Sequence, residues 1–382
     1  MSTFVTHNIY NPSHKTYTGK SFGPYTCLEK IGSGGFCHVY KCTDHHNTFA
    51  IKIYHKHYTY SFNQEASTLI YLKNLSTITP HLATHILLPH DFITSIYSTE
   101  TLHPTIYPLP AIIFPLMHET LYDVMKKLNS GFTLPCTKTI IKQILHGLTF
   151  IHSCGIVHTD IKSNNIILTT PADTTHNKNI NIKIMDFGCA TKPISTDTVG
   201  TTGYQSPESL LHTGFSFPTD IWSFGCLVYE LITGNVLFDK SYLIKNDNTH
   251  DNTNDTSESS ESSETTESSE TAENNESIIT LKLFEKVLGF IPIDMIYNSN
   301  IQYYHDTNDL DLYPTTISQL LQQNHSINIT KSKQIEQFIT FILQYPPSQR
   351  PSITEILEHK FLSPTIKKYT VKKYNKIKKY KK

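Results

Sequence analysis

The positions of the apolar residues predict short strands in the first third of the chain. Residues 25–31, 39–42 and 49–52 are apolar or β-branched runs of strand length, separated by polar or glycine-containing segments. Residues 111–116 (AIIFPL) form a further apolar strand, and its position before Met117 suggests a hinge between two lobes. The alternative is an edge strand, where proline is also allowed. Residues 1–21 are polar and aperiodic, so we expect a flexible arm there.

Later segments have the spacing of helices. Residues 62–75 place apolar side chains three and four positions apart, and residues 137–153 repeat this pattern over a longer stretch. Residues 220–233 are apolar almost throughout and predict another long helix.

The composition restricts the compartment. The 382 residues allow about two packed units. The seven cysteines are scattered and form no CxxC pair, which favours reduced thiols inside a cell over disulfides or zinc sites. No apolar run approaches the length of a membrane span, and the first residues show no secretory signal. We therefore expect an intracellular protein that is cytoplasmic, nuclear or both.

Charge is concentrated in two appendages. Residues 247–276 carry ten acids and no Lys or Arg, so we expect a disordered insert at about 241–277. The alternative is an acidic lure for basic substrates. Residues 366–382 carry nine lysines and no acid. The basic tail, residues 363–382, is either a solvated end or a contact for nucleic acid, the nuclear-import machinery or anionic lipid.

A polar loop between two apolar runs holds the strongest chemical pattern, in residues 156–168 (IVHTDIKSNNIIL). Asp160, Lys162 and Asn165 have the spacing of a phosphoryl-transfer loop. In such a loop the Asp orients a hydroxyl and accepts its proton, the Lys neutralises the transferred phosphate, and the Asn holds magnesium. His158 has no convincing partners for a metal site, so we expect it to be a packed loop residue.

Further motifs follow in order around this loop. Residues 32–39 (GSGGFCHV) form a glycine-rich turn whose main-chain N–H groups can approach phosphates. Lys52 ends a strand, and Glu65 on the next helix can pair with it; each alone would be a solvated charge. Residues 186–188 (DFG) follow another strand, and residues 200–208 (GTTGYQSPE) close a Ser/Thr-rich segment.

Together these motifs resemble the eukaryotic protein kinase family over about residues 22–362. The resemblance implies an α+β, bilobal protein-kinase fold with a β-rich N-lobe at 22–116 and a helical C-lobe at 117–362. It implies a serine/threonine-protein kinase that uses ATP and Mg²⁺ and acts on protein substrates, basic ones if the insert is a lure. The implied catalytic residues are Asp160, Lys162 and Thr201, and the implied metal ligands are Asn165 and Asp186.

The resemblance also assigns structural and nucleotide-binding residues. Asp220 would hold the backbone of the catalytic loop, and Arg350, the single arginine of the chain, would grip Glu208 with both arms of its guanidinium. The implied ATP contacts are Ile31, Gly32, Ser33, Gly34, Gly35, Phe36, Cys37, His38, Val39, Ala50, Lys52, Glu65, Phe114, Met117 and Ile167. Cys37 and Cys189 flank this site, and we expect both to be small buried residues.

Within the family the chain resembles the SR-protein kinase and LAMMER branches of the CMGC group. Thr159 stands where most kinases have Arg, as in those branches, and residues 278–296 follow their helix pattern. The chain departs from the family at Cys37, which takes a glycine position. It also departs at residues 163–165 (SNN), which replace Pro-Glu-Asn, and at Gln205, where the group has Arg.

Thr159 leads to a prediction about regulation. The arginine that it replaces binds a phosphate on the activation loop in the family. We therefore predict activity without phosphorylation of Ser195, Thr196 or Thr198.

A pseudokinase scaffold, which binds partners without phosphoryl transfer, is the alternative function. Its usual mark is the loss of Lys52, Asp160 or Asp186, and the sequence keeps all three.

Overall fold

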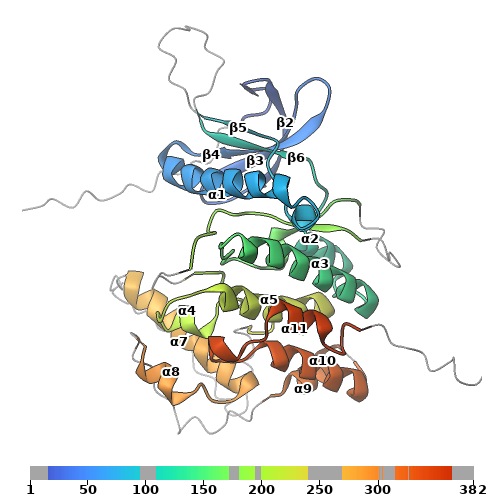
Figure 1. Ribbon diagram of the computed structural model, residues 1–382, viewed down its shortest axis with the longest axis vertical. Helices are drawn as coiled ribbons and strands as arrows, with labels where there is room; N and C mark the ends of the chain where they lie inside the picture. The colour runs from blue at the N-terminus through green and yellow to red at the C-terminus, as the bar shows by residue number, and fades with distance from the viewer. Residues whose placement is uncertain are drawn as a thin grey trace, which may run out of the picture.

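The strand-forming residues of the N-terminal part build one six-stranded antiparallel sheet in the computed structural model of the chain (Figure 1). The strand order is β1-β2-β3-β4-β6-β5. The structure describes residues 16–94, 109–171, 180–193, 199–239, 269–299, 301, 303, 315–325 and 327–363. The strands of this sheet are β1 (Ser21–Phe22), β2 (Tyr25–Ser33), β3 (Cys37–Thr43), β4 (Thr48–Tyr54), β5 (Asp91–Ile93) and β6 (Ala111–Pro115).

Alternation along the strands gives this sheet two buried faces. On one face, Tyr54 and Ile112 pack with Phe62 and Leu69 of helix α1 (Thr59–Ile78), in a core that continues into the helical part of the molecule. On the other face, Tyr40 and its neighbours form a second, smaller core. Because one core runs through both parts, α1 packs against the helical part as well as against the sheet.

The C-terminal part is helical and lies below the sheet in Figure 1. Helix α5 is at its centre, and every residue from Thr219 to Thr233 is buried, which explains its nearly uniform apolar sequence. The observed architecture confirms the bilobal α+β fold that the sequence predicts. The helices are α2 (Leu121–Leu128), α3 (Leu134–Ser153), α4 (Pro207–Leu210), α5 (Phe217–Thr233), α7 (Ser269–Leu288), α8 (Ile293–Tyr297), α9 (Ile317–His325), α10 (Ile329–Ile342) and α11 (Ile353–Glu358).

Two segments that the sequence predicts to be flexible include residues that are folded in the structure. The arm predicted for residues 1–21 is folded at its end, where Tyr17 is buried and its backbone N–H donates to the Tyr40 hydroxyl at 3.1 Å. The insert predicted to be disordered over 241–277 overlaps α7, which already begins at Ser269. Both segments were predicted to be flexible because they are polar. Composition does not reveal the few residues through which they contact the rest of the fold.

The catalytic loop is held between two short strands and the helical part. Strands β7 (Ile166–Leu168) and β8 (Ile182–Ile184) pair antiparallel and flank the loop and the DFG segment. A 3₁₀ turn at Ser163–Asn165 leads directly into β7. None of the helices in the described ranges is long and apolar enough to cross a lipid bilayer.

Candidate active site

Strand β4 and helix α1 bring together the predicted ion pair. The Lys52 ammonium lies 2.8 Å from Glu65 Oε2 and 2.8 Å from Asp186 Oδ1, so one cation joins the N-lobe to the DFG segment. Burial alone would lower the pKa of Lys52, but the two carboxylates outweigh this effect and raise it well above its ordinary value. Lys52 is therefore a fixed positive charge. Tyr54, which no sequence pattern singled out, donates its hydroxyl to Glu65.

The catalytic loop forms a closed hydrogen-bond network around Asp160. Asn165 Nδ2 donates to Asp160 Oδ2 at 2.8 Å, and Lys162 Nζ lies 2.8 Å from the same oxygen. Thr201 Oγ1 donates to Asp160 Oδ1 at 2.6 Å and accepts from Lys162 at 2.6 Å. The three side chains predicted to act with Asp160 therefore meet at its carboxylate, which they hold in a single orientation.

Asp220 of α5 anchors the backbone of this loop, as the resemblance implies. Its Oδ2 accepts from the backbone N–H of His158 at 2.9 Å, and its Oδ1 accepts from that of Thr159 at 2.8 Å. His152 Nε2 lies 2.8 Å from Asp220 Oδ2 and adds a third partner that the sequence did not reveal. These bonds hold Thr159 at φ 67°, a left-handed conformation that is unusual for a β-branched residue.

His158 is a packed loop residue and not a metal ligand. It is fully buried, its Nε2 lies 3.1 Å from the Met185 carbonyl oxygen, and its Nδ1 lies 3.3 Å from the backbone N of Asp160. A neutral ring with the proton on Nε2 satisfies both contacts, because a carbonyl only accepts and a backbone N–H only donates.

Arg350 and Glu208 form the predicted buried pair. Nη1 donates to Glu208 Oε1 at 2.7 Å and Nη2 donates to Oε2 at 2.6 Å, which is the two-armed geometry that lysine cannot make. The other three donors of Arg350 bond to the carbonyl oxygens of Gln344, Pro218 and Tyr345. Burial would raise the pKa of Glu208, but the guanidinium lowers it overall.

Glu230 is a buried functional neighbour that sequence reasoning missed. Its Oε1 accepts from the Ser163 hydroxyl at 2.7 Å and its Oε2 accepts from the Tyr204 hydroxyl at 2.6 Å. It thus ties the catalytic loop to the segment that follows Thr201. The signal was the one carboxylate besides Asp220 within the apolar helix 220–233, because such a residue has to be buried with partners.

Most nucleotide contacts implied by the resemblance lie on strands β2, β3, β4, β6 and β7, in the turn between β2 and β3 and on the connection after β6, whereas Glu65 lies on α1. Five of the apolar ones are only partly buried, whereas strand neighbours such as Tyr40, Ile51 and Ile113 are fully buried. Part of each of these five side chains is therefore accessible to a ligand. These partly buried members are Val39, Ala50, Phe114, Met117 and Ile167.

The glycine-rich turn is open to a ligand. A Cβ atom on Gly34 or Gly35 would meet nothing within 4 Å, so phosphates have room to approach the backbone. Gly32 packs against Val39, because a Cβ atom on this glycine would lie 3.5 Å from the valine Cβ. The flanking apolar side chains Ile31 and Phe36 are largely exposed. Ser33 Oγ lies 2.9 Å from His38 Nδ1 and joins the two sides of the turn.

The two cysteines beside the site differ. Cys37 is buried, as predicted, and burial raises the pKa of its thiol to about 11. Cys189 is exposed, which contradicts the prediction that both are buried. It follows the DFG segment directly, in a turn.

The donor set at Asn165 and Asp186 suits magnesium. Asn165 uses its amide nitrogen on Asp160, which leaves its oxygen available, and about half of the Asp186 side chain is exposed beside Lys52. Burial would raise the pKa of Asp186, but Lys52 lowers it overall, so the carboxylate is ionised. One carboxylate and one amide oxygen next to open space fit a cation that keeps several waters and binds phosphates.

Comparisons with known proteins agree with this geometry. The family model of the protein kinase domain matches residues 25–362. A serine/threonine-protein kinase PLK4 of Drosophila virilis is 30% identical over 238 residues, covering 59% of this chain and 27% of the relative. A serine/threonine-protein kinase ICK of Mus musculus is 40% identical over 131 residues, covering 33% of this chain and 20% of the relative. The chain thus matches only about a quarter of the length of these relatives.

A solved kinase-domain structure aligns with a TM-score of 0.59 at 23% identity, covering 92% of this chain and 99% of that one. This likeness concerns the fold alone. Since the family model spans the sheet, the cleft and the helical part together, the chain belongs to the protein kinase domain family.

Proposed function

We propose that the chain transfers the γ-phosphoryl group of ATP to serine and threonine hydroxyls of proteins. The observation that supports this best is the network at Asp160, where Lys162, Asn165 and Thr201 fix one carboxylate beside the Lys52–Asp186 pair. Two relatives named serine/threonine-protein kinases support the same class of acceptor.

Each residue has a separate task in this proposal. Asp160 orients the acceptor hydroxyl and takes its proton, while Thr201 and Asn165 keep the carboxylate in place. Lys162 places a positive charge beside the transferred group, and Lys52 positions the ATP phosphates from the opposite side of the cleft. Magnesium, when bound at Asn165 and Asp186, neutralises charge on the phosphates. The reaction thus depends on positioning and electrostatics.

The test is radiolabel transfer from ATP with magnesium to myelin basic protein, casein and an Arg-Ser repeat peptide. Asp160→Asn should lower the rate by about 10²–10⁴-fold, the usual contribution of a general base. It should keep the ATP-induced thermal shift, because Lys52 and Asp186 are unchanged. Asp294→Asn in α8 is the matched control and should transfer at the wild-type rate.

A pseudokinase scaffold is the competing function, and the same experiment separates the two. A wild-type chain that gives neither transfer nor an ATP-induced thermal shift would support the scaffold. Transfer that persists at full rate in Asp160→Asn would remove Asp160 from its proposed role.

The finer assignment to the SR-protein kinase and LAMMER branches is also a proposal. It rests on Thr159 and on the pattern of residues 278–296, which form the end of α7, a turn at Gly289 and helix α8. A preference for the Arg-Ser peptide over casein would support it, and the opposite preference would contradict it.

We further propose an intracellular location, cytoplasmic or nuclear. The scattered free thiols support it, and the basic tail is a candidate contact for import factors or nucleic acid. Apart from Ser363, that tail lies outside the described residues. Imaging of the full chain beside a variant with the nine tail lysines changed to glutamine tests the nuclear part, because import through the tail requires those charges.

A further inference from the structure

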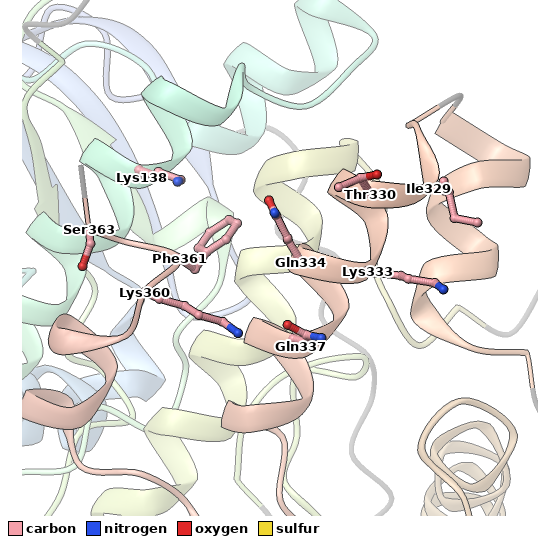
Figure 2. A pocket seen from close by; sticks show the side chains of 9 residues that line it. All are labelled: Lys138, Ile329, Thr330, Lys333, Gln334, Gln337, Lys360, Phe361 and Ser363. Carbon is pink, nitrogen blue, oxygen red and sulfur yellow. The ribbon is translucent and has the colours of Figure 1, made fainter. Parts of the chain in front are cut away.

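Three lysines line a groove on the C-lobe, at a distance in the fold from the candidate active site. It has a volume of about 630 Å³ and lies between the start of α3, helix α10 and the segment after α11 (Figure 2). We call it the lysine groove. Its principal lining residues are Lys138 from α3, Lys333, Gln334 and Gln337 from α10, and Lys360 and Phe361 from the last segment.

The charges in the lysine groove are not neutralised by the described part of the chain. Within that part, none of the three lysines forms an ion pair with a carboxylate, and no acid lines the groove. Partial burial and the nearby Lys142 both lower the pKa of Lys138, so the surroundings disfavour its charged form. An anion in the groove would relieve this repulsion.

Helix geometry adds to the positive potential. Lys138 lies in the second turn of α3, and Thr330 lies in the first turn of α10 and also lines the groove. The first turns of helices carry unpaired N–H groups and a partial positive charge. The charge of a lysine near a helix N-terminus adds to this positive potential, which favours the binding of anions.

Phe361 limits which anion fits. One face of its ring stacks on Phe338, with centroids 4.5 Å apart, and the Lys138 ammonium lies over the ring at 4.4 Å. Because only 7% of Phe361 is exposed, the ring offers no platform for a nucleobase, which is how aromatic side chains bind single-stranded nucleic acid. The available contacts are ammonium, amide and hydroxyl donors, and these suit oxyanions.

We propose that the lysine groove docks a peptide segment that carries phosphoserine or phosphothreonine. A phosphate places nearly two negative charges and three acceptor oxygens on one group, which matches several lysines and amides around one cavity. The proposal rests on the proposed function, because serine and threonine transfer produces such segments. A substrate held by its first phosphate would present further hydroxyls to Asp160 at a high effective concentration.

The test measures binding of a fluorescein-labelled peptide with two phosphoserines to the full chain by fluorescence anisotropy. In the groove variant, Lys138, Lys333 and Lys360 are changed to glutamine. We expect its dissociation constant to rise by at least about tenfold, since charge-assisted hydrogen bonds are lost. The control variant changes Lys56, Lys126 and Lys331 to glutamine, three exposed lysines outside the groove, and should bind within about twofold of wild type.

Further arms distinguish docking in the groove from a general attraction to basic residues. The unphosphorylated peptide should bind at least about tenfold more weakly than the phosphopeptide. A variant with glutamine at the nine tail lysines should retain the effect of the groove substitutions. Equal loss in the groove and control variants, or equal binding of a peptide with glutamate at both positions or of a single-stranded oligonucleotide, would overturn the proposal.

The binding assay needs no phosphoryl transfer, so Asp160→Asn should bind the phosphopeptide as wild type does. A wild-type chain that binds the phosphopeptide in the groove but transfers no phosphate would refute the proposed function and leave the groove proposal intact. The groove variant should transfer phosphate to an unphosphorylated peptide at the wild-type rate, which also shows that it is folded. On a substrate with many serines it should release intermediates earlier, as mass spectrometry of the products would show.

Discussion

At the scale of single residues, Glu230 is a carboxyl group buried without a cation beside it in the described structure. Its partners are the hydroxyls of Ser163 and Tyr204, and burial raises its pKa above the ordinary value. The folded protein therefore holds this proton more tightly than the unfolded chain does. The stability due to this group is complete below the ordinary carboxyl pKa and falls as the pH rises toward the folded-state value.

We expect Glu230→Gln to stabilise the protein more at pH 8 than at pH 5. Glutamine keeps one acceptor and one donor for the two hydroxyls and removes the buried charge. The melting temperature at pH 8 should rise by about 1–2 °C, which corresponds to ~1 kcal/mol for a protein of this size. Glu358→Gln, on an exposed site of α11, is the control, and a pH-dependent gain there would show that burial of Glu230 is not the cause.

Arg350→Lys should destabilise the protein although it keeps the charge. A lysine cannot reach both Glu208 oxygens and three carbonyl groups, so buried acceptors lose their donors. We expect a loss of about 2–4 kcal/mol, measured by urea unfolding. The reverse exchange Lys331→Arg, at an exposed position of α10, should change stability by less than about 0.5 kcal/mol.

The residues that the sequence predicted well are those that can be recognised by their spacing along the chain. Asp160, Lys162 and Asn165 lie within one loop, and Glu65 was the only acid between Lys52 and Asp91. Tyr54, His152 and Glu230 were missed because their partners come from distant segments. Their roles depend on tertiary packing, and only Glu230 carries a local signal, as a carboxylate within an apolar helix.

At the scale of elements, the loop after α2 packs against the end of α5 through a glycine. A Cβ atom on Gly131 would overlap the backbone of Ile232 and lie 2.6 Å from the nitrogen of Thr233. The neighbouring Phe132 N–H donates to the Leu231 carbonyl oxygen at 2.7 Å, so this contact joins backbone to backbone. Side-chain adjustment cannot make room there.

Gly131→Ala should therefore cost about 2–3 kcal/mol in the free energy of unfolding, the upper part of the range for overpacking. The measurement is chemical denaturation followed by circular dichroism. Gly35→Ala is the control, because a Cβ atom there would meet nothing within 4 Å and the backbone is not left-handed. Equal effects of the two substitutions would show that the loss is not due to the close contact.

Elements with strong periodicity were predicted within a few residues, as for 137–153 against α3 (Leu134–Ser153). The beginning of α7 was not, because its first turns are as polar as the acidic insert before them. Glu276, within the acidic tract, accepts from the Thr202 hydroxyl at 3.2 Å, so this part of α7 reaches the segment beside the catalytic loop. Such a contact is visible only in three dimensions.

At the scale of the whole molecule, regulation depends on how the catalytic loop is connected to the rest. Thr159 is buried, its backbone N–H is held by Asp220, and its hydroxyl donates to the Cys189 carbonyl oxygen at 2.9 Å. The loop is thus fixed by contacts within the chain at the position where the family has an arginine. Ser195, Thr196 and Thr198 lie outside the described residues.

We therefore expect phosphatase treatment to leave the rate of substrate phosphorylation within about twofold of the untreated rate. The reason is that this position holds no arginine that could bind a phosphate on the activation segment. The measurement compares treated and untreated recombinant protein on myelin basic protein, after removal of the phosphatase. Mass spectrometry has to show that the activation segment is free of phosphate. A large fall in rate under that condition would contradict the prediction.

The ion pair between Glu208 and Arg350 also determines when the C-lobe can finish folding during protein synthesis. The two residues are 142 positions apart, so the ribosome completes Glu208 long before Arg350. Until the arginine emerges, burying Glu208 would leave an unpaired charge in the interior, at a cost of several kcal/mol. The C-lobe therefore completes its packing only after nearly all of it has been translated. A chain that stops before residue 350 would remain unfinished and open to the proteases that clear incomplete proteins.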